Sequence, residues 1–261
     1  MSVVSNRRQA LRVGVAAVAS AVGLWANIAS AATAGAPKLA VMSMLGRDVH
    51  VVETGGQVGS RLSTRVSSLN LKSGLMDNRA MLMIDQYARG HFAPENITML
   101  GTQGQMWTEL QQDAMASAAG MRDMVATVTD AARQANCTHA LVLMKYRSTA
   151  QLQLAYTTIG FGMIEGMGFY VDSEIRTNEI GTQNTTKGVL APYVYLQLLL
   201  IDVNKASLVR SQTAKASTYF VPENGSLTAP WEVLSPEGKV DSLTKLLDAE
   251  LARLVPSLLK G

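Results

Sequence analysis

Hydrophobic side chains that recur every three or four residues predict helices in three parts of the chain. Residues 77–91 and residues 108–132 show this spacing, which places apolar side chains on one helical face. Gly120 can divide the second stretch into two helices, because glycine weakens a helix interior. A last helix should begin at Ser235-Pro236-Glu237, and Pro256 is expected to end or kink it.

Continuous or alternating apolar runs predict strands. Two pairs of runs read as hairpins, one turning at Gly46-Arg47 and the other at Asn204-Lys205-Ala206. The stretch Thr54–Ser68 is rich in glycine and serine and predicts a loop. The runs that predict strands are 38–45, 48–53, a short run near Ile97, 139–146, 189–203 and 208–218.

The order of these elements predicts the fold class α+β. We expect a mixed, largely antiparallel sheet with helices packed on one face, in a single domain that follows a signal peptide. The predicted boundaries are a signal peptide over 1–31, a linker over 32–37 and the α+β domain over 38–261, with a Gly/apolar insertion around 148–188.

Two segments of this pattern carry a resemblance to a known family. A helix leads into Cys137–Val142, and the strand Tyr193–Asp202 turns at Asn204-Lys205 into Leu208–Ser211. This arrangement resembles the anticodon-binding-like domains of periplasmic envelope proteins, such as the amino-terminal domain of TolB, LpoB and CsgG. The resemblance covers roughly half of the predicted domain and rests on pattern rather than on a diagnostic motif. It implies a role in the cell envelope.

The amino-terminal residues predict export. Arg7, Arg8 and Arg12 precede an Ala/Val/Gly-rich run over 13–25, and the small-residue site Ala29-Ser30-Ala31 follows. This is the layout of a cleavable signal peptide, and the apolar run is shorter than the about 20 residues of a spanning helix. The run Asn6–Arg12 resembles a twin-arginine export signal, with Ala10 where that pattern prefers phenylalanine; the alternative is an ordinary secretory signal.

Charge and cysteine content narrow the class of partner. Residues 1–31 hold three of the 23 basic and none of the 20 acidic residues, so the mature chain carries 20 of each. A chain without basic excess does not suit nucleic acid, and we expect no nucleic-acid partner. Because Cys137 is the single cysteine, we expect no intrachain disulfide. Cys137 lies far from the cleavage site, so we also expect no lipid anchor. The short apolar run over 13–25 predicts no permanent membrane anchor. The expected location is the periplasm or the secreted fraction.

The sequence offers no pattern that predicts catalysis. Metal binding needs several converging ligands, and the three histidines, His50, His91 and His139, are not paired at ligand spacing. Cys137 and His139 lie two residues apart, but two groups without a third orienting residue make neither a metal site nor a nucleophile pair. Gly162-x-x-x-Gly166-x-Gly168 has the glycine spacing of short-chain dehydrogenases without the downstream Tyr-x-x-x-Lys of that family. We therefore expect no catalytic residue, metal or cofactor.

One segment combines apolar side chains with four glycines in the stretch Thr157–Asp172. The glycines disfavour helix and strand, whereas the intervening side chains are too apolar for a free loop. Two interpretations stay open: the segment folds onto its own sheet, or it projects as a loop or hairpin whose apolar patch contacts a partner, another copy or a lipid surface. The residues of this possible interaction segment are Ile159, Phe161, Met163, Ile164, Met167, Phe169 and Tyr170.

These observations lead to a functional hypothesis. The chain is expected to be an exported, non-enzymatic domain that binds another cell-envelope component or self-associates. The alternative is a periplasmic small-molecule-binding protein or an enzyme of an unrecognised type, which a twin-arginine signal favours because that route exports folded proteins.

Overall fold

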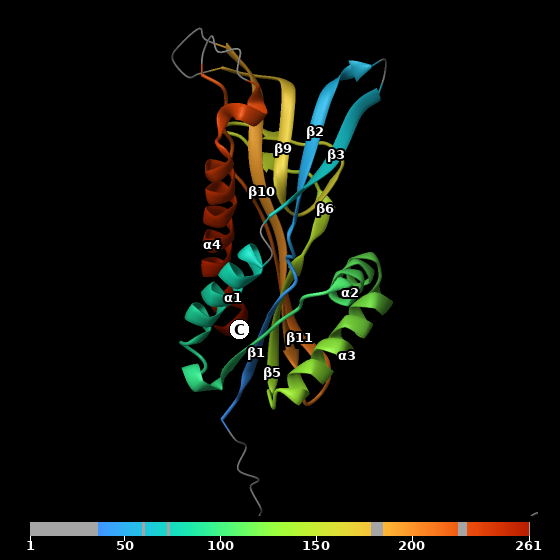
Figure 1. Ribbon diagram of the computed structural model, residues 1–261, viewed down its shortest axis with the longest axis vertical. Coiled ribbons are helices and arrows are strands. Elements are labelled where there is room, and N and C mark those ends of the chain that lie inside the picture. The colour runs from blue at the N-terminus through green and yellow to red at the C-terminus, as the bar shows by residue number, and fades with distance from the viewer. Residues whose placement is uncertain (1–35, 59–60, 72–73, 179–184, 224–228, 261) are drawn as a thin grey trace, which may run out of the picture. The chain divides into compact units, whose positions relative to one another are not determined.

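The computed structural model describes residues 36–58, 61–71, 74–178, 185–223 and 229–260, all within one compact unit, Ala36–Gly261. The predicted signal peptide and residues 32–35 of the predicted linker lie outside the described residues. Figure 1 labels the helices and most strands. The helices are α1 (Leu75–Ala88), α2 (Gln105–Ala116), α3 (Ala118–Gln134) and α4 (Pro236–Lys260), with short 3-10 turns at Pro94–Asn96 and Pro230–Val233. The strands are β1 (Leu39–Ser43), β2 (Asp48–Val58), β3 (Arg61–Asn70), β4 (Ile97–Leu100), β5 (His139–Lys145), β6 (Arg147–Thr149), β7 (Leu152–Gln153), β8 (Thr158–Ile159), β9 (Met163–Asn178), β10 (Thr185–Asp202) and β11 (Ser207–Ser217).

The predicted fold class is confirmed. The main sheet has the order β3-β2-β9-β10-β5-β1-β4, with β11 beside β10 and β6 beside β9. Strand β1 is parallel to β4 and β5, and β2 is parallel to β9, whereas the other pairs are antiparallel. The sheet is therefore mixed and largely antiparallel, and the fold is α+β.

Strand β10 changes its partner halfway along its length. Residues 185–195 pair with β9, and residues 196–202 pair with β5. We call the step between Tyr195 and Leu196 the exchange point. It divides the sheet into a half with β5, β1 and β4 and a half with β9, β2 and β3, which Figure 1 shows at opposite ends of β10.

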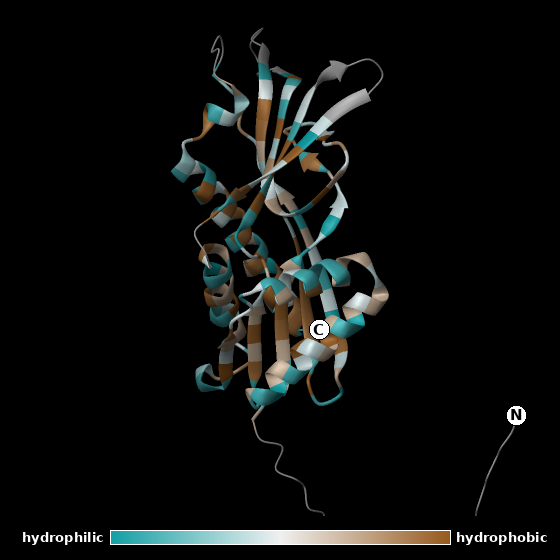
Figure 2. Cartoon of the chain, turned by 45° about the vertical axis from the view of Figure 1, so that its right-hand side comes forward, coloured by the Kyte–Doolittle hydropathy of each residue, from teal (hydrophilic) through white to brown (hydrophobic). Residues whose placement is uncertain are grey.

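The prediction that the helices pack on one face of the sheet is wrong. Helices α1 and α4 lie on one side of the strands and α2 and α3 on the other (Figure 1), where they pack against two separate groups of buried side chains. Alternate residues of β1 take part in each group, Leu39 and Val41 in the first and Ala40 and Met42 in the second. A strand that is apolar on both faces, as parallel strands commonly are, needs cover on both sides. In Figure 2 the strands between the two helix pairs are largely brown, the colour of hydrophobic residues.

The hairpin predicted at Gly46-Arg47 does not form. Strand β1 pairs with β4 and β5, and β2 pairs with β3 and β9. The carboxylate of Asp77 accepts hydrogen bonds from the backbone N–H of Leu45 at 2.9 Å and of Gly46 at 3.1 Å, so this turn is bound to α1. The loop predicted over Thr54–Ser68 is also wrong, because this stretch contributes to the antiparallel strands β2 and β3.

The other predicted elements are found with small shifts. The hairpin at Asn204-Lys205 is confirmed as β10 and β11, and the strand predicted over 139–146 is β5. The break between α2 and α3 falls at Ser117, whose hydroxyl accepts a hydrogen bond from the N–H of Gly120 at 3.0 Å. Helix α4 continues through Pro256 to Lys260, and burial of Val255 and Leu258 against the sheet offsets the lost backbone bond.

Candidate functional site

In the described part of the chain, the half of the sheet with β9 and β2 has a helix on one face only. Phe169, Leu190 and Val194 pack on the side of α4, whereas the opposite face is covered by residues 147–162, which include β6, β7 and β8. We call residues 147–162 the cover. Its side chains Ala150 and Leu152 pack with buried residues of the sheet, so the cover closes a core to which no described helix contributes.

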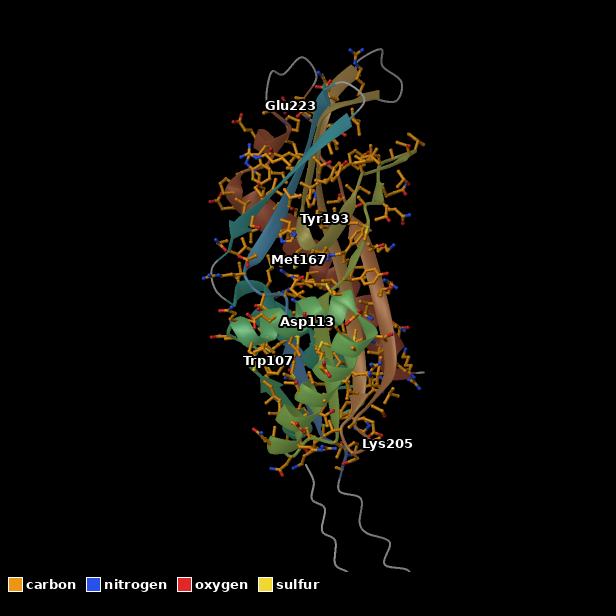
Figure 3. All side chains as sticks on the ribbon, turned by 90° about the vertical axis from the view of Figure 1, so that its right-hand side faces the viewer. Trp107, Asp113, Met167, Tyr193, Lys205 and Glu223 are labelled. Atoms are coloured by element: carbon orange, nitrogen blue, oxygen red, sulfur yellow. The ribbon has the colours of Figure 1, made fainter. Side chains whose placement is uncertain are left out.

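Three buried tyrosines lie beneath the cover, and two of them bind its backbone. The hydroxyl of Tyr170 accepts a hydrogen bond from the N–H of Phe161 at 3.0 Å. The hydroxyl of Tyr195 accepts from the N–H of Gln151 at 2.9 Å and donates to the carbonyl of Gln151 at 3.1 Å. The hydroxyl of Tyr193 has no hydrogen-bond partner among the described residues. Figure 3 shows Tyr193 in the half of the sheet above Trp107 and Asp113 of α2.

The structure divides the predicted interaction segment into a buried and an exposed part. Ile164, Met167, Phe169 and Tyr170 are buried in β9, as the interpretation of a segment folded onto its own sheet requires. Ile159 is half-buried, whereas the exposed fraction is 52% for Phe161 and 58% for Met163. Glycines do not prevent a strand here, because β9 is paired with β2 and β10 on its two edges.

The exposed part of the cover includes a residue that the sequence patterns do not single out. Tyr156 lies between β7 and β8, and its exposed fraction is 80%. Phe161 of the cover and Met163, which follows the cover as the first residue of β9, complete three exposed large apolar side chains within eight residues of sequence. A tyrosine between two short strands has no periodic signal, so only the three-dimensional arrangement identifies it.

A polar groove lies between the cover and β11. It has a volume of about 600 Å³, and its only charged lining residue is Lys215. Its walls are fixed by the hydrogen bond from the N–H of Gln153 to the Ser217 hydroxyl, at 3.0 Å. The lining residues are Gln151, Gln153, Thr158, Lys215, Ala216 and Ser217.

Charged side chains gather beside the exchange point. Lys145, the last residue of β5, is buried, and its ammonium donates to the carbonyl of Asp48 at 3.3 Å. Glu165 is also buried and accepts from Nε of Arg147 at 2.6 Å. Burial lowers the pKa of Lys145, against the opposing effect of the nearby carboxylates, of which Glu165 is the strongest. The cluster holds a buried carboxylate paired with the partly exposed Arg147, and one buried ammonium that bonds only to backbone among the described residues.

The same cluster makes stability depend on the protonation of His50. Burial lowers the pKa of His50, and the positive charge of Lys145 lowers it further, while Glu165 and Asp48 oppose the shift and Arg147 adds to it. Between the lowered folded-state pKa and the ordinary value of 6.5, the unfolded chain binds more protons than the folded one. The contribution of His50 to stability is therefore lost as the pH falls through this window.

We expect His50→Gln to reduce the loss of stability on acidification. Glutamine removes the titrating ring, while the other ionisable groups remain the same in both proteins. The measurement is the urea unfolding free energy at about pH 7.5 and about pH 5. If the unfolding free energy of the variant fell between the two pH values by as much as that of the unaltered protein, His50 would be excluded as a contributor.

The structure also shows how the histidine and cysteine side chains are placed. No group of three His, Cys, Asp or Glu side chains in the described part of the chain is arranged to hold a metal ion. Cys137 is buried, which raises the pKa of its thiol, and the Nδ1 atom of His139 is 2.9 Å from the Thr138 hydroxyl. Among the described helices, none is both long and apolar enough to cross a membrane.

Comparisons with known proteins identify similar structures but no family. Neither the protein-family models nor the curated proteins contain a match to this chain. Among solved structures, a protein described as a neuraminyllactose-binding hemagglutinin homologue from Helicobacter pylori is 8% identical with a TM-score of 0.39, covering 86% of this chain and 89% of its own. The hypothetical protein CT253 from Chlamydia trachomatis is 11% identical with a TM-score of 0.31, covering 86% and 99%.

The LpoB C-terminal domain from Salmonella enterica is also among the similar structures. It is 12% identical with a TM-score of 0.24, covering 70% of this chain and 84% of its own. LpoB is one of the proteins that the sequence pattern resembles, whereas the resemblance to TolB and CsgG stays a prediction. At TM-scores below 0.5 we draw no functional argument from these likenesses.

Proposed function

We propose that this chain is an exported, non-enzymatic domain that binds another component of the cell envelope or a second copy of itself. Export is proposed from the amino-terminal pattern of residues 1–31, which directs the domain to the periplasm or beyond it. The proposal for binding rests on one structural observation, the exposed apolar side chains of the cover and of the adjoining first residue of β9. The surface that we assign to binding consists of Tyr156, Phe161 and Met163.

The backbone that carries these side chains is already ordered. The N–H of Phe161 bonds to the buried Tyr170 hydroxyl, and Met163 begins β9 opposite Thr149 of β6. Binding costs less free energy when the contacting groups need no further ordering. A partner that covers these large apolar side chains removes them from water. This burial stabilises the complex by about 25 cal/mol per Å² of apolar surface.

The test is the double substitution Phe161→Ser and Met163→Ser. We expect it to weaken self-association in sedimentation experiments, or to abolish capture of a defined envelope component that binds the unaltered protein. The expected loss is at least about tenfold in affinity, because two anchoring residues that each contribute more than about 1 kcal/mol together exceed the about 1.4 kcal/mol of a tenfold change.

A matched control separates this effect from a general loss of surface apolarity. Leu208 and Val209 are exposed on β11, and Leu208→Ser with Val209→Ser removes a comparable pair of apolar side chains. This control should bind as the unaltered protein does. Equal binding by both double variants and the unaltered protein would contradict the proposal.

A further inference from the structure

We infer that the groove between the cover and β11 binds a small carboxylate that also carries hydroxyl groups, of the chemical class of sugar acids. The inference goes beyond the proposed function, because it assigns a second and polar surface to the domain. It supports small-molecule binding, the alternative that the sequence leaves open.

The positive charge in the groove favours an anionic ligand. Lys215 is the only charged lining residue, and no acidic side chain of the described residues lies within 4 Å of its ammonium. The ammonium lies 5.9 Å from the ring centroids of both Tyr146 and Tyr195, at the outer limit of a cation–π contact with each ring. A lysine that has no carboxylate partner in the protein can pair with a carboxylate of the ligand.

The remaining polar groups of the lining favour a ligand that carries hydroxyl groups. The Gln151 amide and the Ser217 hydroxyl can donate and accept hydrogen bonds, whereas the Thr158 hydroxyl, which donates to Gln153, can accept one. The side chain of Gln151 makes no hydrogen bond to the described residues, whereas Ser217 accepts from the N–H of Gln153 and keeps its proton for a ligand. Sugar hydroxyls are likewise both donors and acceptors, so they match this lining better than an apolar or purely anionic ligand does.

The walls of the groove are preorganised and of suitable size. The backbone of Gln151 is held by the Tyr195 hydroxyl, and Thr158 donates to the side-chain oxygen of Gln153 at 3.2 Å. A volume of about 600 Å³ lies within the range of about 300–1,000 Å³ that is usual for small-molecule sites. The volume of the groove therefore suits a small ligand.

Calorimetric titration with glucuronate tests the inference, with glucose and propionate as comparison ligands. Glucose keeps the hydroxyls without the carboxylate, and propionate keeps the carboxylate without the hydroxyls. We expect glucuronate to bind at least about tenfold more tightly than either, since a charge-assisted bond and several neutral ones are both required. No binding of glucuronate, or equal binding of the three ligands, would overturn the inference.

Variants locate the binding in the groove. Lys215→Met should weaken glucuronate binding by about tenfold or more, whereas Lys245→Met, which removes an exposed lysine paired with Asp241 on α4, should leave it unchanged. Gln151→Leu should weaken binding of glucuronate through its lost amide. Binding that survives both Lys215→Met and Gln151→Leu would place the ligand elsewhere and refute the site.

The outcome is independent of the apolar surface of the cover. The variant Phe161→Ser with Met163→Ser keeps every lining residue of the groove, and it should bind glucuronate as the unaltered protein does. Failure of glucuronate binding with intact self-association or partner capture would reject the groove alone. Glucuronate binding without any self-association or partner capture would reject the proposed function and retain the groove as a binding site.

Discussion

Phe169→Ala is expected to lower the free energy of unfolding by about 3–5 kcal/mol, which is the usual cost of truncating a buried phenylalanine. The side chain of Phe169 is 3% exposed and packs edge to face on Trp231, with 5.4 Å between the ring centroids. Its removal leaves a cavity between β9 and the turn that precedes α4. Urea unfolding followed by tryptophan fluorescence and by circular dichroism measures the change.

Phe161→Ala is the matched control, since it makes the same substitution eight residues earlier. Phe161 is 52% exposed, so we expect a change of less than about 1 kcal/mol in the same unfolding experiment. Association should show the opposite pattern: Phe161→Ala weakens binding to a partner or a second copy, whereas Phe169→Ala acts mainly on stability. A comparable loss of stability in both would contradict the division of the segment into a buried and an exposed part.

Gly168→Ala should destabilise the fold by about 3 kcal/mol, at the upper end of the usual cost of overpacking. A Cβ atom at this position would lie 2.3 Å from the carbonyl oxygen of His50 and 2.4 Å from the hydroxyl oxygen of Tyr193. Gly168 is paired with His50 in the parallel register of β2 and β9, so neither backbone can move without loss of that pairing. Thermal and urea unfolding of the variant measure the effect.

Gly90→Ala provides the control for this substitution. A Cβ at Gly90 would contact nothing within 4 Å, and the residue is not in the left-handed conformation. We expect a change within about 0.5 kcal/mol. If Gly168→Ala were as mild as Gly90→Ala, the close approach of β2, β9 and Tyr193 would be refuted.

Local patterns predicted the elements whose partners are near in sequence. The hairpin of β10 and β11 combines apolar runs with a turn at Asn204-Lys205, so its pairing follows from short-range signals. The region of β1 and β2 has similar signals around Gly46-Arg47, but the strands separate there. The two strands pair with different strands distant in sequence, and Asp77, about thirty residues away, binds the turn between them; no local pattern encodes these contacts.

The candidate site shows the same limit. The sequence identified the apolar, glycine-containing segment but not which of its side chains face solvent, because burial depends on pairing of β9 with β2 and β10. Alternate residues then divide between the two faces of β9, with Phe169 toward α4 and Tyr170 toward the cover. The groove was not predicted either, since Gln151 and Lys215 are 64 residues apart and neither belongs to a recognisable motif.

The change of partner along β10 has a consequence for the order in which the chain can fold. The parallel pairs join Leu39 to His139 and His50 to Gly168, which are separated by 100 and 118 residues, so topology alone favours folding in milliseconds to seconds. Strands β5 and β9 pair with β1 and β2 on one edge, and each relies on β10 to pair the other edge. A nascent or truncated chain that ends before Thr185 would therefore present two unpaired strand edges at once, and such edges recruit other chains into aggregates.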